Sequence, residues 1–101
     1  MPGHAHPVEE FLKRLDVAIQ GDAVEMSDDA LETAGVQFGW GFGEVIAVLM
    51  MLEAADYADS MPSDAPEGGR IWVFTPTLTE GRVWIRLCER GKVVVVSFHR
   101  G

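Results

Sequence analysis

The residues whose types and spacing could do chemistry lie on one predicted strand, residues 82–90. Val83, Ile85 and Leu87 alternate there with Arg82, Trp84, Arg86, Cys88 and Arg90. Because side chains of a strand point to its two faces in turn, the apolar residues form a core face and the others share the opposite face. That face could bind phosphates through guanidinium groups and stack a nucleobase on the indole. An exposed sheet face with cation–π pairs around Trp84 is the more common explanation of such a pattern.

His99 is the second candidate for chemistry. On the predicted last strand Val94, Val96 and Phe98 alternate with Val95, Ser97 and His99. If Phe98 faces the core, His99 emerges on the polar face of the sheet. Histidine titrates closest to neutral pH of all side chains, so His99 beside Arg100 could act as a general acid or base. An ordinary surface histidine near a chain end is the more common explanation.

Three other residues are weaker candidates. His4 and His6 could bind a metal, but residues 1–7 are predicted to be flexible. Cys88 has no histidine or acidic residue at an interpretable local spacing, which favours a structural thiol over a nucleophile. The sequence contains no glycine-rich phosphate loop and no HExxH or GxSxG motif. We therefore predict no metal and no cofactor.

Charge is divided unevenly along the chain. Residues 1–69 carry two basic and fourteen acidic side chains, a net charge of −12, whereas residues 70–101 carry six basic and two acidic ones, a net charge of +4. A basic region in a protein of net charge −8 indicates a local anion-binding site, because uniform attraction to nucleic acid needs a basic protein. Mutual neutralisation of the two regions where they pack together is the alternative.

Length and composition predict one globular domain over residues 1–101. A chain of 101 residues supplies a single core, and its hydrophobic and charged fractions of 48% and 24% are ordinary for a globular protein. The longest apolar run, residues 45–52, is shorter than the ~20 residues needed to cross a bilayer. The lack of a secretion signal and the single cysteine favour a reducing, cytoplasmic location.

Two helices are predicted in the first third of the chain. Apolar residues at spacings of three and four predict a helix over residues 8–20, which Gly21 ends. A short extended piece is predicted over residues 23–26. A second, short helix follows, with Ser27 as its N-cap and Gly35 at its close.

The rest of the chain predicts a loop, a core helix, a connector and strands. Residues 38–43 alternate aromatic residues with glycines, which favours a loop. Residues 44–59 are apolar on nearly all sides, as in a buried helix, and residues 60–69 are rich in proline and glycine, as in a connector. Strands are predicted at residues 70–75, 82–89 and 92–99. The predicted fold is α+β, with N-terminal helices packed on a small antiparallel sheet of about three C-terminal strands.

In this order the elements resemble the MqsR toxin family, bacterial mRNA interferases of the wider RelE-like fold class. The resemblance runs from about Val8 to Arg100. It rests on the order and spacing of these segments: Ala30-Leu31, residues 35–38, residues 56–61, Ile71-Trp72, residues 76–87 and residues 93–99. It implies a RelE-like fold.

The resemblance also implies an activity and two partners. The activity is that of a type II toxin, a metal-independent endoribonuclease that inhibits translation and growth. In such an enzyme a ribose 2′-hydroxyl attacks the adjacent phosphate, while cations stabilise the developing charge. The implied substrate is single-stranded mRNA, and the implied protein partner is a cognate antitoxin.

Four positions depart from the family's active-site pattern. Asp59 and Val73 stand where family members carry a lysine and a glutamine. Trp84 replaces a tyrosine and keeps a stacking surface, and His99 replaces a lysine of the final strand and keeps the capacity for proton transfer. Asp59 inverts a charge and repels a phosphodiester, unless it serves as the base in the attack.

The predicted site combines residues on the polar face of strand 82–90 with residues that the resemblance implies. We predict His99, Arg86 and Asp59 as catalytic residues. We predict that Arg82, Trp84, Arg70 and Arg100 bind RNA. The hypothesis requires that the indole of Trp84, its flanking guanidinium groups and the imidazole of His99 converge on one exposed patch of the sheet.

Two other functions fit the same sequence. One is a catalytically inactive toxin-like domain that binds a protein through its acidic helical half, which the residues at 59 and 73 favour. The other is an acidic mimic of nucleic acid, which requires carboxylates spaced along one exposed surface.

Overall fold

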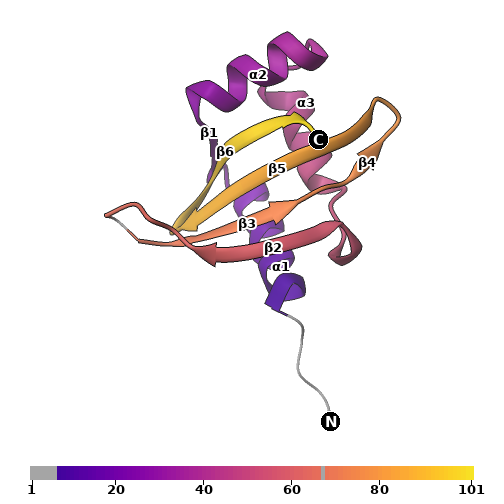
Figure 1. Cartoon of the computed structure of the whole chain (residues 1–101). Helices are drawn as coiled ribbons and strands as arrows, with labels where there is room; N and C mark the ends of the chain where they lie inside the picture. Colours follow the sequence, from indigo (N-terminus) through magenta and orange to yellow (C-terminus); the bar gives the residue numbers. More distant parts are fainter. Residues whose placement is uncertain (1–6, 67) are drawn as a thin grey trace.

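The computed structural model describes residues 7–66 and 68–101, in which three helices pack against a mixed six-stranded sheet (Figure 1). The helices are α1 (Pro7–Gln20), α2 (Asp28–Phe38) and α3 (Phe42–Met50), followed by the 3₁₀ turn η1 (Ala54–Asp56). The strands are β1 (Val24–Met26), β2 (Tyr57–Pro62), β3 (Arg70–Phe74), β4 (Thr77–Leu78), β5 (Gly81–Arg90) and β6 (Lys92–Arg100). The α+β class is therefore confirmed.

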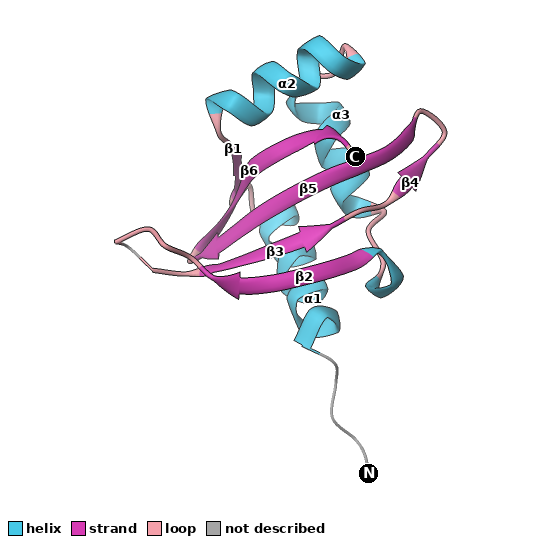
Figure 2. Ribbon diagram, viewed as in Figure 1, coloured by secondary structure: helices cyan, strands magenta, loops and turns pink. Residues whose placement is uncertain are grey.

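The sheet is larger than expected and is not purely antiparallel. Its strands follow the order β1-β6-β5-β3-β2, with β4 paired to β5 beside this path. β1 pairs parallel with β6, and the other pairs are antiparallel. The extended piece predicted at residues 23–26 thus becomes an edge strand of the sheet. In Figure 2, α1 and α3 lie behind the sheet, and no helix crosses its front.

α1 forms where the sequence predicts it and begins one residue earlier. Val8, Phe11 and Leu15 occupy one side of the helix and are buried. Pro7 is the first helical residue, a position where its missing N–H costs nothing, so the predicted flexible segment does not extend to residue 7. Residues 1–6, with His4 and His6, lie outside the described residues.

α2 continues past the glycine that was expected to end it. Ser27 is the N-cap as predicted, since its Oγ accepts a hydrogen bond from the Ala30 amide at 3.1 Å. The helix ends instead at Gly39, whose φ of 73° provides the left-handed cap. Phe38 explains the extension, because its ring stacks on Trp40 at 4.7 Å and packs edge-on to Phe98 at 5.7 Å between centroids.

The predicted helix over residues 44–59 is wrong in its second half. α3 begins at Phe42, inside the predicted loop, and ends at Met50. β2 then occupies the last turn of the expected helix and the start of the expected connector. Tyr57 anchors this strand against Trp72 and Phe74, with ring centroids 6.1 Å apart in both pairs. These contacts come from β3, so the local pattern of residues 57–62 does not show them.

β6 contains an irregularity that changes which residues face the core. Arg86 of β5 pairs with Ser97 while the next residue, Leu87, pairs with Val95, so Val96 is an extra residue on β6. Val95 and Phe98 therefore face the helices, whereas Val94 and Val96 pack on the other side. The expectation that Val94, Val96 and Phe98 share a face is wrong.

Among the described residues, no single helix is long and apolar enough to cross a membrane. α2 and α3 pass that test only when counted together, and they are bent by 91° at the break between them.

The core depends on Phe11, which is fully buried and stacks on Trp72 with ring centroids 4.6 Å apart. We expect Phe11→Ala to lower the free energy of unfolding by about 3–5 kcal/mol, because it leaves a cavity between α1 and β3. Val17→Ala on the same helix is the control, since Val17 is 70% exposed and should change stability by about 0.5 kcal/mol or less. Urea denaturation measures both, and equal losses would contradict this account of the core.

Candidate functional site

The face of the sheet away from the helices, which we call the open face, carries most of the predicted site. Directly opposed residues of neighbouring strands place their side chains on the same face. One rung across the sheet joins Asp59, Val73, Arg86 and Ser97. The next residue pair on the same face of β5 and β6 is Trp84 and His99. Val83, Ile85 and Leu87 are fully buried on the other side, which confirms the predicted two faces of β5.

Trp84 and His99 lie side by side on the open face, near the end of β6. Their rings stack with centroids 6.4 Å apart and planes 12° apart, and the Trp84 residue is 37% exposed. The Nδ1 of His99 lies 2.8 Å from the carbonyl oxygen of Arg100. A carbonyl oxygen can only accept, so Nδ1 donates in this contact, and Nε2 of a neutral ring is left as an acceptor. The expected convergence of the indole and the imidazole is confirmed.

Arg82 and Arg86 flank Trp84 on the same face of β5. Both residues are exposed. Within the described part of the chain, neither guanidinium group has an ion pair or hydrogen bond. Two cations beside an exposed indole can therefore bind an anion without first breaking a contact within the protein.

Arg70 and Arg100 lie on the helix-covered face instead. Arg70 donates a hydrogen bond from Nη2 to the Ser60 hydroxyl at 3.0 Å, and its guanidinium lies 5.7 Å from the Trp72 ring centroid. Arg100 donates from Nη2 to the Gln37 carbonyl at 3.0 Å and lies over Phe38. Neither joins the Trp84–His99 pair. Arg100 follows His99 directly, so alternation along the strand already signalled this placement.

Asp59 lies on the open face but far from the imidazole. It is exposed on the edge strand β2, and its Oδ1 accepts a hydrogen bond from the Ser60 amide at 2.8 Å. Two strand spacings of ~4.8 Å separate β2 from β5, and a third leads to β6. The structure therefore does not bring Asp59 next to His99.

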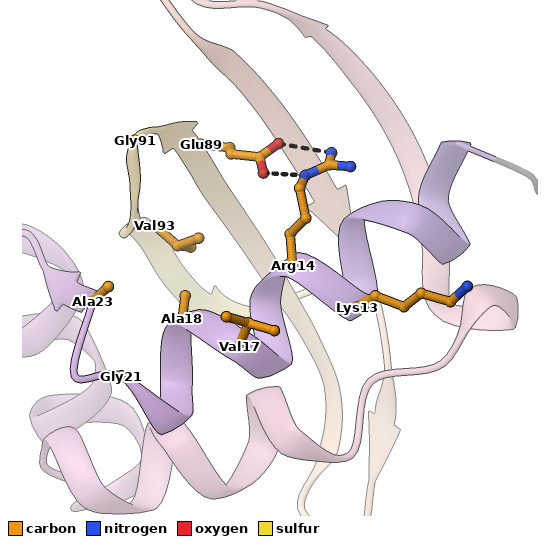
Figure 3. Close-up of a pocket in the computed structure, with 9 residues that line it drawn as sticks. All are labelled: Lys13, Arg14, Val17, Ala18, Gly21, Ala23, Glu89, Gly91 and Val93. Atoms are coloured by element: carbon orange, nitrogen blue, oxygen red, sulfur yellow. Dashed lines mark hydrogen bonds and ion pairs between the residues drawn. The ribbon is translucent and has the colours of Figure 1, made fainter.

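Mutual neutralisation does not account for the charge pattern. Among ion pairs between described residues, Lys92–Glu25, at 2.9 Å, joins a basic residue of the last third to an acid of the first part. Arg14 of the first part pairs with Glu89 of the last third, and both residues line a cavity of about 500 Å³ between α1 and the β5–β6 turn (Figure 3). The hydrogen bond that Arg14 donates to the Glu89 carboxylate raises the pKa of Arg14. These pairs leave Arg82 and Arg86 unneutralised.

A groove that the sequence did not reveal adjoins Arg86 on the open face. Its volume is about 360 Å³. It is lined by Met61, Pro62, Ser63, Asp64, Ala65, Ile71, Arg86, Val96 and Ser97. Strand alternation could have placed Ser97 beside Arg86. Nothing in the sequence around residues 63–65 predicts that they line this groove, because their neighbours in the groove belong to the distant strands β3, β5 and β6.

Residues 7–66 and 68–101 contain no group of three histidine, cysteine, aspartate or glutamate side chains arranged to bind a metal ion. Cys88 is buried, with the Nη1 of Arg90 3.6 Å from its Sγ. The prediction that the protein works without a metal stays a prediction.

Comparison with models of known protein families gives a match over most of the chain. The family model for the MqsR toxin, described as "Motility quorum-sensing regulator, toxin of MqsA", matches residues 9–100. The matched range includes every residue of the open face named above. No curated protein matches the chain.

The stacking of His99 on Trp84 can be tested by NMR. The ring current of an indole shields protons that lie over its face, so we expect the ring-proton signals of His99 to lie upfield of those of a free imidazole. In Trp84→Ala these signals should move downfield, whereas in Trp40→Phe they should stay in place, because Trp40 packs on Phe38 and Phe98. A His99→Ala variant assigns the signals. Unchanged signals in Trp84→Ala would contradict the stacking.

Proposed function

Because the chain belongs to the MqsR toxin family, we propose that it acts in the cytoplasm as the toxin of a type II toxin–antitoxin system, by cleaving mRNA. The observation that carries this proposal is the exposed Trp84–His99 stack, flanked by Arg82 and Arg86, which have no acidic partner among the described residues. Cleavage of mRNA inhibits translation and growth. The family description names its members as toxins of MqsA, so we propose a cognate antitoxin as the protein partner.

His99 takes the part of the general base. In the neutral ring the contact of Nδ1 with the Arg100 carbonyl leaves Nε2 free to take the proton of a ribose 2′-hydroxyl. The 2′-oxygen then forms a bond to the adjacent phosphorus while the bond from phosphorus to the 5′-oxygen breaks. The products are a 2′,3′-cyclic phosphate and a 5′-hydroxyl. The leaving 5′-oxygen takes a proton from solvent, and the imidazolium returns its proton to solvent.

Arg86 and Trp84 bind the substrate around this base. A nucleobase stacks on the exposed indole, which contributes about 1–3 kcal/mol per base in single-stranded complexes. Arg86 lies two residues further along β5, on the same face as Trp84 and His99. Its guanidinium donates hydrogen bonds to the phosphate oxygens, on which negative charge grows during the attack. Arg82, on the other side of Trp84, binds the neighbouring phosphate.

The activity and its dependence on His99 can be measured together. We expect the purified protein to cleave single-stranded RNA in the presence of a metal chelator. His99→Ala should cleave it about 10²- to 10⁴-fold more slowly, the usual contribution of a general base. Mapping RNA 5′ ends after induction in a bacterium tests the same activity in cells. Intact RNA with the folded wild-type protein, or full activity of His99→Ala, would overturn the proposal.

Asp59 takes no part in this mechanism, and a substitution at this residue tests whether it is needed for cleavage. Its carboxylate lies at the edge of the open face and repels phosphate, so we expect Asp59→Asn to cleave RNA as fast as the wild type or up to several-fold faster at low salt. Glu53→Gln is the charge-matched control, since Glu53 lies before β2 outside the open face. A loss of activity in Asp59→Asn would assign Asp59 a catalytic role.

One observation favours a second function, binding of a protein without catalysis. Large apolar side chains are exposed on and beside α2 and α3: Leu31, Val36, Phe42, Met50 and Met51. Such side chains in an acidic helical half suit a protein partner. This function predicts a stoichiometric protein complex and no RNA cleavage by the wild type. The acidic mimic of nucleic acid stays a prediction.

A further inference from the structure

We propose that the groove beside Arg86 binds the nucleobase adjacent to the one stacked on Trp84, and that Asp64 selects that base through its hydrogen-bonding edge. The inference rests on the proposed function. It adds a second base-binding position and a residue that determines which base is accepted.

The groove is continuous with the Trp84–His99 pair. Trp84 opposes His99, and Arg86 opposes Ser97 in the next residue pair on the same face of the sheet. Arg86 and Ser97 also line the groove. Arg86 therefore lies between the indole and the groove, where it can bind the phosphate that joins two successive nucleotides. A dinucleotide fits this order, with one base on Trp84, its phosphate on Arg86 and the next base in the groove.

The extra residue in β6 shapes the floor of the groove. Because Val96 is unpaired in the β5–β6 register, Val96 and Ser97 both reach the open face and both line the groove. Val96, Ile71 and Met61 give the floor an apolar surface. A nucleobase has apolar faces and polar edges, so its faces suit this floor. The volume of about 360 Å³ lies within the range of small-molecule sites, about 300–1,000 Å³.

The polar groups around the floor are available to a ligand. In the part of the chain that the structure describes, the Asp64 carboxylate and the Ser97 hydroxyl have no hydrogen-bond partner. Ser63, by contrast, already accepts a hydrogen bond from the Ala65 amide at 3.1 Å. An ionised carboxylate can only accept hydrogen bonds, so a base edge that faces Asp64 has to present N–H donors. The four bases differ in the number and arrangement of their N–H donors, so this requirement ranks them by how well their edge matches the carboxylate.

The loop that carries Asp64 is fixed at both ends. The Ser63 amide donates to the Gly69 carbonyl at 3.0 Å, and the Gly68 amide donates to the Ala65 carbonyl at 2.9 Å. Gly69 has a φ of 99°, and a Cβ atom there would lie 2.7 Å from the Glu89 carbonyl oxygen. Gly69 therefore lies directly against β5, and the two hydrogen bonds tie Ser63 and Ala65, the neighbours of Asp64, to the end of the loop.

Asp64→Asn tests the proposal, because an amide donates as well as accepts and so changes which base edge fits. The measurement is the base composition around the cut sites in a random-sequence RNA, for purified wild type, Asp64→Asn and Glu32→Gln. Glu32→Gln removes the same charge on α2, away from the groove. We expect Asp64→Asn to change the base preference by about 5- to 150-fold at one position next to the cut, the range of one bidentate base contact. The control should keep the wild-type preference.

A binding measurement separates the inference from the proposed function. His99→Ala is titrated with four oligonucleotides that differ at the selected position, with and without Asp64→Asn. The inference predicts that the ranking of the four affinities changes with Asp64→Asn. If the wild type cuts RNA and neither cut sites nor affinities change with Asp64→Asn, the groove does not select a base, and the nuclease proposal stands. If the wild type neither cuts nor binds RNA, both proposals fall.

Discussion

The antiparallel pairing of β5 with β6 is the constraint on which the rest of the structure depends. It buries Ile85 against Phe98 on the helix side and sets Trp84 against His99 on the open face. The same register places Arg86 opposite Ser97. Core and candidate site are thus two sides of one ladder of hydrogen bonds. A one-residue slip would move Trp84 and His99 into the core and expose their apolar neighbours, so burial of the apolar face also fixes the geometry of the site.

Much of the ladder could be predicted, because alternation is a local property. The alternation in residues 82–90 correctly predicted which side chains of β5 face the core. The placement of Phe98 in the core correctly predicted that His99 lies on the same face as Trp84. The extra residue at Val96 could not be predicted, since it is defined by the partner strand. β2 was missed for the same reason: residues 57–62 show no alternation of apolar and polar side chains, and pairing with β3 makes them a strand.

Charge in this protein is arranged locally rather than overall. On the open face, Arg82 and Arg86 lack acidic partners among the described residues, whereas Arg70 and Arg100 bind neutral groups on the helix side of the sheet. A protein of net charge −8 repels nucleic acid at a distance and attracts it only where such cations meet a stacking surface. Asp59 and Asp64 at the margin of the open face repel phosphate, so they reduce the area that attracts nucleic acid. This arrangement favours a small footprint of one or two nucleotides over general RNA binding.

The central claim is that the Trp84–His99 pair and Arg86 form a site for attack of a 2′-hydroxyl on its own phosphate. Analysis of the end groups of a cleaved oligoribonucleotide, in the presence of a metal chelator, tests this claim most directly. The account predicts a 2′,3′-cyclic phosphate on the upstream fragment and a 5′-hydroxyl on the downstream fragment. A 5′-phosphate on the downstream fragment, cleavage of an oligonucleotide with 2′-deoxyribose at the cut site, or an intact oligonucleotide would contradict it.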